Sequence, residues 1–288
     1  MKITNPALYE AVLKVALAKV EGMSGRDVPD RWLMPGVVTL YRFVQPRHVP
    51  ILACDLATKR SLVSQSAVQE CLRVRDQATD DHRFTGKNAK GKPGPTGGVY
   101  FSLNPGALLA EMMFYGEQSV AKALTKMDIP NILPYDVASQ RISIDYLLAH
   151  QSILVAQLER PVMVADVSLY SQSRTGEVRR FLNEIGRDPA VSKLLVGKSL
   201  PDLMLDPHDY SVARAIGHAI QSTRRYDGML AETARVTNRR GETGSNLILF
   251  EQDEAVLTGL AIEDALYFFA PGVTNHDKVM KAAVTTRF

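Results

Sequence analysis

The chain has few cysteines and no long apolar run. Its 288 residues include two cysteines, Cys54 and Cys71, which are too few for a disulfide framework or a four-cysteine zinc site. Two reduced thiols are the simpler interpretation, and a single disulfide bridge between them is the alternative. No stretch approaches the roughly 20 apolar residues of a membrane helix, and the N-terminal segment lacks the pattern of a signal peptide. These absences predict a cytoplasmic protein with no membrane partner.

An excess of charge of one sign is also missing. The chain holds 34 Lys and Arg against 31 Asp and Glu, a net charge of +3. That value is too small to indicate nucleic acid as the main partner. Apolar residues make up 45% and charged residues 23%, which excludes a disordered or fibrous chain and predicts a globular protein with a sizeable core.

The common catalytic motifs are absent as well. The chain contains no GxxxxGK[ST] phosphate loop, no GxGxxG after an expected strand, no HxxxH pair and no GxSxG elbow. These absences argue against P-loop nucleotide hydrolases, dinucleotide-binding Rossmann enzymes, zinc proteases and α/β-hydrolases. No metal is expected.

The first third of the chain predicts two strands and two helices around a loop. Asn5-Pro6 reads as a cap and first residue of an amphipathic helix. The β-branched and aromatic residues of 36–43 and 99–103 predict strands, and Asn104-Pro105 opens a second helix. Between the strands, residues 86–98 hold five glycines, two prolines and three lysines, so this segment is expected to be a loop with a solvated, mobile charge run.

The rest of the chain adds a buried strand, a helix and a closing strand. The apolar run 161–169 suits a buried strand. Val212, Ile216 and Ile220, with Ala215 and Ala219, form one apolar stripe of a helix. Asp227-Gly228 predicts a turn, 232–245 a polar loop, and 246–250 a final strand. Helices and strands interleave irregularly, which predicts an α+β domain.

Glu111 is the candidate that the residues themselves offer. The side chains three and four positions away on its expected helix include Leu108, Phe114 and Tyr115. A carboxylate on such a face points into protein or a cleft, where an unpaired charge is costly. A half-buried glutamate bonded to a nearby arginine remains the alternative.

Three stretches resemble the RES domain family. GGVYFSLNPGALLAEMMFY resembles the family's strand with a Tyr leading into a helix with a Glu. ARAIGHAIQSTRRYDGMLAETARVTNRRGETGSNLILF is similar to its C-terminal block, and LYRF to its opening strand with an Arg. The stretches occur in the family's order and span about 37–250.

The resemblance implies a fold, an activity and partners. The fold would be an ADP-ribosyltransferase-like mixed sheet with flanking helices. RES proteins are typically toxins that consume NAD, often beside an Xre-like antitoxin, so an antitoxin or immunity protein is an expected partner. Relative to a compact RES domain, 1–35 would be an N-terminal helical extension, 36–255 the catalytic domain with an insertion around 129–205, and 256–288 a segment packed on the domain.

The resemblance also implies a site. Arg42 takes the place of the family's Arg, Glu111 that of its Glu, Thr233 that of its Ser, and Tyr100 that of an active-site Tyr. The expected catalytic residues are Glu111, Arg42, Tyr100 and Thr233; the expected NAD-binding residues are Arg42, Arg83, Tyr100, Thr233 and Arg235. The chain departs from the family in three ways. Threonine adds a methyl group to the expected hydroxyl. Arg83-Phe84, the nearest equivalent of a Gly-Gly-Arg-Trp/Phe segment that often precedes the family's Tyr, lacks the glycines and is followed by an enlarged Gly/Lys loop. The chain is also longer than a compact RES toxin.

These residue types suit NAD cleavage. Nicotinamide leaves as a neutral group, and the developing charge lies on the ribose as an oxocarbenium ion, which a fixed carboxylate stabilises. Arginine forks suit the pyrophosphate. The reaction would be hydrolysis or phosphorolysis. One alternative is ADP-ribose transfer to a protein, and another is a non-enzymatic polyanion-binding module built on the basic loop.

Each candidate also has an ordinary structural explanation. Arg42 would be a surface or ion-paired residue, Tyr100 a core aromatic and Thr233 a locally bonded loop residue. Arg83 would belong to a solvated run of positive charge. The arrangement of these side chains in space decides between the explanations.

Overall fold

The structure is a computed structural model, and part of the chain is described. Side chains are described for residues 3–21, 29–42, 82–103, 108, 158, 160–168, 176–206, 208–232 and 244–250. The backbone alone is described for 43–44, 51–55, 60–63, 135–136, 141–142, 152–157, 175, 233–237, 243, 260–261 and 267–268.

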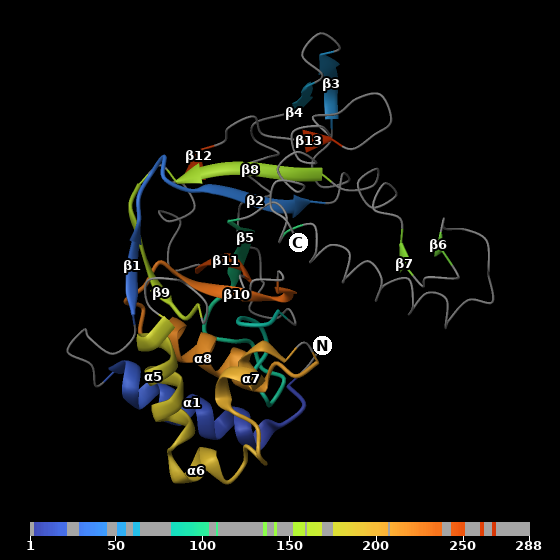
Figure 1. Ribbon diagram of the computed structural model, residues 1–288. Coiled ribbons are helices and arrows are strands. Elements are labelled where there is room, and N and C mark those ends of the chain that lie inside the picture. Colours follow the sequence, from blue (N-terminus) through green and yellow to red (C-terminus); the bar gives the residue numbers. More distant parts are fainter. Residues whose placement is uncertain are drawn as a thin grey trace.

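A mixed sheet forms the centre of the described part (Figure 1). Its strands follow the order β1-β9-β10-β11-β5-β2-β8-β12, and β13 also pairs with β8. Their bounds are β1 Asp30–Leu33, β2 Thr39–Val44, β5 Gly98–Ser102, β8 Ser152–Leu158, β9 Val162–Asp166, β10 Gly228–Thr237, β11 Thr243–Phe250, β12 Leu260–Ala261 and β13 Tyr267–Phe268. Strands β9 and β10 pair in parallel, and the other pairs are antiparallel.

Two separate hairpin-like pairs complete the described strands. One joins β3, Ile51–Asp55, to β4, Arg60–Val63. The other joins β6, Tyr135–Asp136, to β7, Arg141–Ile142. Neither pair belongs to the main sheet.

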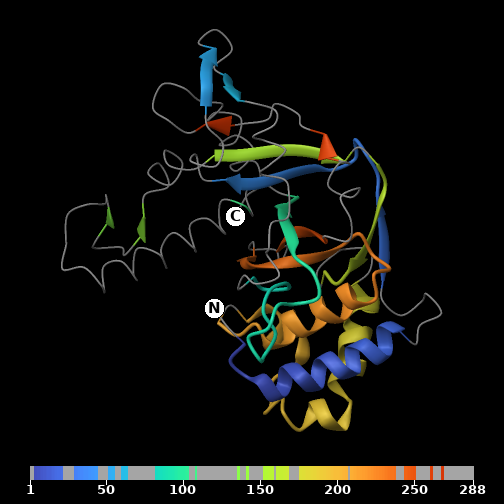
Figure 2. The same ribbon diagram turned by 180° about the vertical axis from the view of Figure 1, so that it is seen from behind.

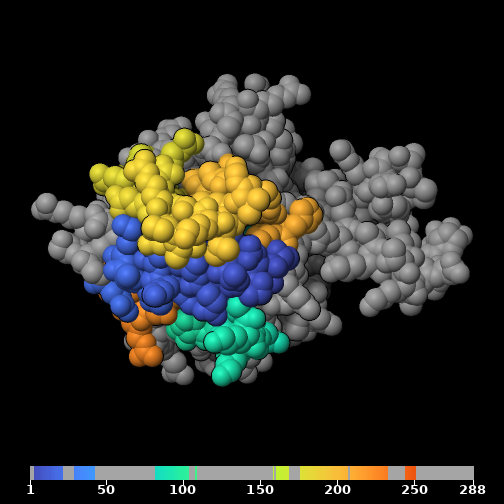
Figure 3. All heavy atoms as spheres, turned by 90° about the horizontal axis from the view of Figure 1, so that it is seen from below, coloured from blue at the N-terminus to red at the C-terminus, as the bar shows by residue number. Residues whose placement is uncertain are grey.

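Helices cover one side of the sheet (Figures 1 and 2). They are α1 Pro6–Glu21, α5 Thr175–Gly186, α6 Pro189–Ser192, α7 Leu200–Leu205 and α8 Ser211–Ser222. Seen from below, α1 lies between the α5–α6 region and the segment that leads into β5 (Figure 3). Helices on one side of a mixed sheet confirm the expected α+β class. Within the described residues, no helix is long and apolar enough to cross a membrane.

The N-terminal helix begins where the sequence predicts. Asn5 Oδ1 accepts a hydrogen bond from the amide of Leu8 at 3.0 Å, and Pro6 is the first helical residue. An asparagine cap of this kind contributes about 1 kcal/mol. Val12, Ala16 and Val20 of α1 are fully buried. The segment expected as an extension is therefore part of the main hydrophobic core.

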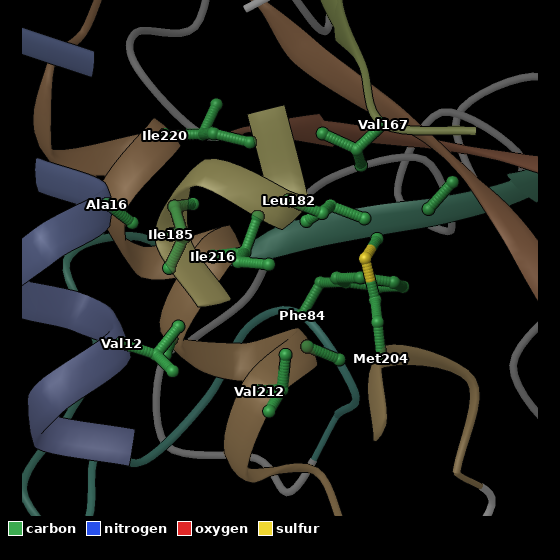
Figure 4. Close-up of a cluster of buried hydrophobic side chains, with 14 of the residues drawn as sticks. Val12, Ala16, Phe84, Val167, Leu182, Ile185, Met204, Val212, Ile216 and Ile220 are labelled. Carbon is green, nitrogen blue, oxygen red and sulfur yellow. The ribbon is translucent and has the colours of Figure 1, made fainter. Parts of the chain in front are cut away.

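That core lies between the helices and the sheet (Figure 4). Val212, Ile216 and Ile220 of α8 point into it, as the apolar stripe predicts. Phe84 and Met204 fill the space between α8 and the sheet. Residues Ser211 to Gln221 of α8 are all buried, so the helix is enclosed by protein on its polar side as well.

Strand β10 corrects one expectation. The segment 232–245 was predicted to be a polar loop, but β10 continues to Thr237 and β11 already begins at Thr243. Glu232 pairs with Ser245, and the register shifts between Glu232 and Thr237. Pairing with β11 thus extends β10 through Thr233, Val236 and Thr237, which are residue types common in strands.

Other elements match the sequence in part. Strands β5, β9 and β11 lie where strands were predicted, while β2 begins three residues later than the 36–43 estimate. Of the helix expected after Asn104-Pro105, Leu108 is helical and the remainder lies outside the described residues. The insertion expected around 129–205 supplies β8 and β9 to the main sheet.

Candidate functional site

The three stretches that carry the RES resemblance become four neighbouring strands. In the sheet order β10-β11-β5-β2, the opening stretch is β2, the central stretch is β5, and the C-terminal block supplies β10 and β11. Tyr41 pairs with Ser102, Ser102 with Asn246, and Asn246 with Ala231. Stretches some 190 residues apart in the chain thus meet in one row across the sheet.

Directly paired residues share one face of the sheet. Tyr41, Ser102 and Asn246 are therefore on one face, and Tyr100 joins them because it lies two residues before Ser102. The partner of Tyr100 is Ile248, which belongs to the core beneath α8. We call the set Tyr41, Tyr100, Ser102 and Asn246 the polar row; it lies on the helix-covered face.

Arg42 is on the other face. It follows Tyr41 along β2, and side chains alternate along a strand. Leu40, two residues before Arg42, is fully buried on that opposite face. The register thus separates the half-buried side chain of Arg42 from Tyr100, although the two strands are neighbours. Arg42 and Tyr100 were expected to meet at one site, and among the described side chains these two do not meet.

Tyr100 is fixed at its hydroxyl and at its ring. The amide of Phe84 donates to the hydroxyl at 3.1 Å, and the Thr85 hydroxyl lies 3.2 Å from it. The His82 ring lies against the Tyr100 ring, with centroids 5.2 Å apart and planes inclined by 31°. Tyr100 is therefore held in one orientation by the segment 82–85, and its side chain is half-buried.

Arg83 packs against aromatic rings and a backbone carbonyl of the protein. Its Nη2 donates to the Met204 carbonyl near the end of α7, and its guanidinium lies 5.7 Å from the Phe84 ring centre and 5.8 Å from that of Tyr210. These contacts are typical of cation–π packing. They hold the guanidinium between the loop and α7, and it is therefore not part of the solvated run of charge that was the structural alternative. Phosphate binding by Arg83 stays a prediction.

The basic loop is folded on itself. Asn88 Oδ1 accepts from the amides of Lys90 and Lys92 at 2.9 and 3.0 Å, and the Asn88 amide donates to the Lys92 carbonyl at 2.8 Å. The side chains of Lys87, Lys90 and Lys92 are exposed. The charge run is solvated as expected, but hydrogen bonds close its backbone into a turn.

Three predicted site residues have no described side chain. Glu111 lies outside the described residues. Thr233 and Arg235 are in β10 beyond Glu232, the last residue before the register shift, and their backbone alone is described. Their roles stay predictions.

The polar row includes residues that sequence reasoning missed. Ser102 is 1% exposed and Asn246 8% exposed, so each polar group is buried in the sheet. Burial raises the pKa of Tyr41, and a side-chain hydrogen bond from Thr39 opposes the rise. The signal was available in part, because the two-residue period of VYFS already places Tyr100 and Ser102 on one face.

Two buried carboxylates were also missed. Glu232 is 3% exposed, and Asp166, on the neighbouring parallel strand β9, is 1% exposed. Asp166 pairs with Leu230, two residues before Glu232, so both acids are on the face opposite the polar row. Asp166 Oδ1 accepts from the Ser168 amide at 3.0 Å. Glu232 was hidden by its placement in an expected loop.

Comparisons with known proteins give a structural likeness and no match in sequence. No family model and no curated protein sequence matches the chain. A chain of the crystal structure of the M. tuberculosis MbcT–MbcA toxin–antitoxin complex is similar to it, with a TM-score of 0.45 and 13% identity. The alignment covers 96% of this chain and 99% of that one.

Proposed function

We propose that the chain is a RES-type toxin that cleaves the nicotinamide–ribose bond of NAD. The observation that carries the proposal is the adjacency of β10, β11, β5 and β2, which joins the three RES-like stretches in one sheet with the polar row running across them. A chance resemblance of three short stretches would not require them to be neighbours in the fold.

The chemistry of the polar row supports this proposal. Tyr100 offers a fixed aromatic ring for stacking on nicotinamide or ribose. Ser102 and Asn246 add hydroxyl and amide groups able to bond ribose or phosphate oxygens. Glu111 would supply the carboxylate that stabilises the oxocarbenium ion, and the hydroxyl of Thr233 would bond the substrate.

Arg42 takes a different place in the proposal. Because its side chain is on the face opposite Tyr100, the nicotinamide end of the substrate belongs with the polar row and not with Arg42. Arg235 remains the arginine of the C-terminal block proposed to bind the pyrophosphate. An Xre-like antitoxin is the partner that the RES resemblance implies, and the cytoplasm is the location that belongs to this proposal.

The direct test is nicotinamide release. Purified protein is incubated with NAD, and free nicotinamide is followed by liquid chromatography for wild type and for Glu111→Gln. The expected result is release by wild type and a loss of about 10²-fold or more in Glu111→Gln, since the lost charge stabilises the transition state. Glu177→Gln, at an exposed position of α5, is the matched control and should leave the rate unchanged.

Two further arms identify the acceptor. Adding inorganic phosphate should change the sugar product to ADP-ribose-1″-phosphate if the reaction is phosphorolysis, and leave ADP-ribose if it is hydrolysis. Labelled NAD with cell extract should give a labelled protein band if ADP-ribose is transferred to protein. Absence of nicotinamide release by folded wild type in all arms would refute NAD cleavage.

A further inference from the structure

Helix α8 carries a buried polar stripe beside its apolar one. Arg214, His218 and Gln221 recur every three or four residues and therefore lie on one side of the helix. They are 1%, 2% and 1% exposed. Buried polar side chains need partners to offset the loss of water, and the partners of this stripe are mostly backbone groups of one segment, residues 82–87.

The stripe fits the backbone of that segment closely. Arg214 donates from Nη2 to the His82 carbonyl and from Nη1 to the Lys87 carbonyl, the latter at 3.1 Å. Gln221 Nε2 lies 3.5 Å from the Phe84 carbonyl. Gly217, between the two, has no side chain, and a Cβ there would collide with the Phe84 carbonyl. The polar side of α8 thus holds the backbone of residues 82–87 in place through these contacts.

The segment 82–87, which α8 holds in place, is the same segment that contacts Tyr100. Its Phe84 amide and Thr85 hydroxyl contact the Tyr100 hydroxyl, and its His82 ring lies against the Tyr100 ring. A continuous chain of contacts therefore runs from the Arg214 guanidinium through 82–85 to the ring that the proposed function assigns to the substrate.

We propose that Arg214 is a positioning residue that sets the orientation of Tyr100 through the segment 82–87. The guanidinium bridges two carbonyls five residues apart and closes the segment over α8, which no single-donor side chain can do. The effect on catalysis rests on the proposed function. The effect on the segment does not.

The first experiment measures the segment itself. Trypsin cleavage after Lys87 and Lys90, both exposed, is followed in the folded full-length chain, together with hydrogen exchange of 82–97. Arg214→Met should increase the cleavage rate about tenfold or more, because local opening controls access. Arg214→Lys should recover part of the protection, and Arg179→Met, at an exposed position of α5, should match wild type.

Equal cleavage and exchange in folded Arg214→Met and wild type would overturn the proposal. If Arg214→Met fails to fold, Gln221→Leu takes its place, since it removes the contact to the Phe84 carbonyl and keeps the guanidinium. Gln221→Leu should expose the segment by a smaller factor than Arg214→Met. If the segment is as protected from trypsin and from hydrogen exchange in that variant as in wild type, the side chains of α8 do not hold it in place.

The second experiment tests the route through Tyr100. A double-mutant cycle combines Arg214→Met with Tyr100→Phe and reads kcat and KM for nicotinamide release. Arg214→Met should lower kcat by up to about 10²-fold, the usual cost of misplacing a catalytic group, and change KM less than about twofold. Added to Tyr100→Phe, it should cost little more, because the pair acts as a unit.

Additive effects of the two substitutions would refute the Tyr100 route. If wild type releases no nicotinamide, the proposed function fails, and the cycle is read on the trypsin rates, where the same non-additivity is expected. The two failures are thereby distinguishable.

Discussion

Two glycine-to-alanine substitutions in helices should have opposite effects on stability. Gly217 lies in α8, and a Cβ there would meet the carbonyl oxygen, carbonyl carbon and Cα of Phe84. Gly176 lies in the first turn of α5, and a Cβ there would have nothing within 4 Å. The same chemical change therefore probes one close backbone approach against open space.

The magnitude at Gly217 follows from three terms. Alanine gains about 1 kcal/mol of helix propensity over glycine. Forcing a methyl group against backbone costs about 1–3 kcal/mol, and displacing 82–87 weakens the charged bonds from Arg214, worth about 1.5–3 kcal/mol each. Gly217→Ala should thus lower the free energy of unfolding by about 2–4 kcal/mol.

Urea unfolding followed by circular dichroism measures both variants. Gly176→Ala should be neutral or more stable by up to about 1 kcal/mol, because alanine reduces the entropy of the unfolded chain. Gly217→Ala should shift the midpoint to lower urea with an unchanged slope. A Gly217→Ala protein as stable as wild type would refute the close contact between α8 and the segment 82–87.

Two further predictions concern buried polar groups. Burial, with the Arg214 charge, lowers the pKa of His218 from 6.5 to about 4, so the folded state favours the neutral ring. The difference contributes about 3 kcal/mol to the free energy of unfolding. This contribution is present above pH 6.5 and is lost as the pH falls toward 4. The pH dependence of urea unfolding should be flatter in this range for His218→Gln, and identical curves would contradict it. Asn5→Ala should cost about 1 kcal/mol by removing the helix cap, and thermal unfolding with no loss would contradict the capping bond.

The helices show what local sequence can predict. Asn5-Pro6 marks the start of α1, and the spacing of Val212, Ile216 and Ile220 marks the buried side of α8, because both signals depend on residues within two turns of each other. The shorter helices α6 and α7 also begin at local caps, which were not predicted. The side chain of Asp188, which precedes Pro189, accepts a hydrogen bond from the Ala190 amide. The side chain of Ser199 accepts one from the Asp202 amide.

The sheet shows what local sequence leaves open. Residues 233–237 mix β-formers with Arg235 and run into Asn238 and Gly241, so the segment was predicted to be a loop, yet pairing with β11 extends the strand through it. That pairing is with the next strand of the chain, and its register is not contained in residues 233–237 themselves. The same limit applies to the polar side of α8, where Arg214 and Gln221 are buried because 82–87 folds against them.

The candidate site was predicted as residues and not as geometry. The order of the three RES-like stretches predicted that β2, β5 and the C-terminal block belong together, and the sheet order agrees. The register could not be predicted, because a shift of one residue exchanges the two faces of a strand. For that reason the separation of Arg42 from Tyr100 and the buried Ser102 and Asn246 emerged from the structure alone.

The most direct test of the account compares two tyrosines in nicotinamide release. Tyr100 is in the polar row, and Tyr226 is a buried tyrosine of the segment between α8 and β10 that does not belong to the row. Tyr100→Phe should lower kcat/KM for NAD by about tenfold or more, since it releases the hydroxyl that fixes the ring, while Tyr226→Phe should retain it. Equal kcat/KM values for Tyr100→Phe and wild type would contradict a catalytic site built on the polar row.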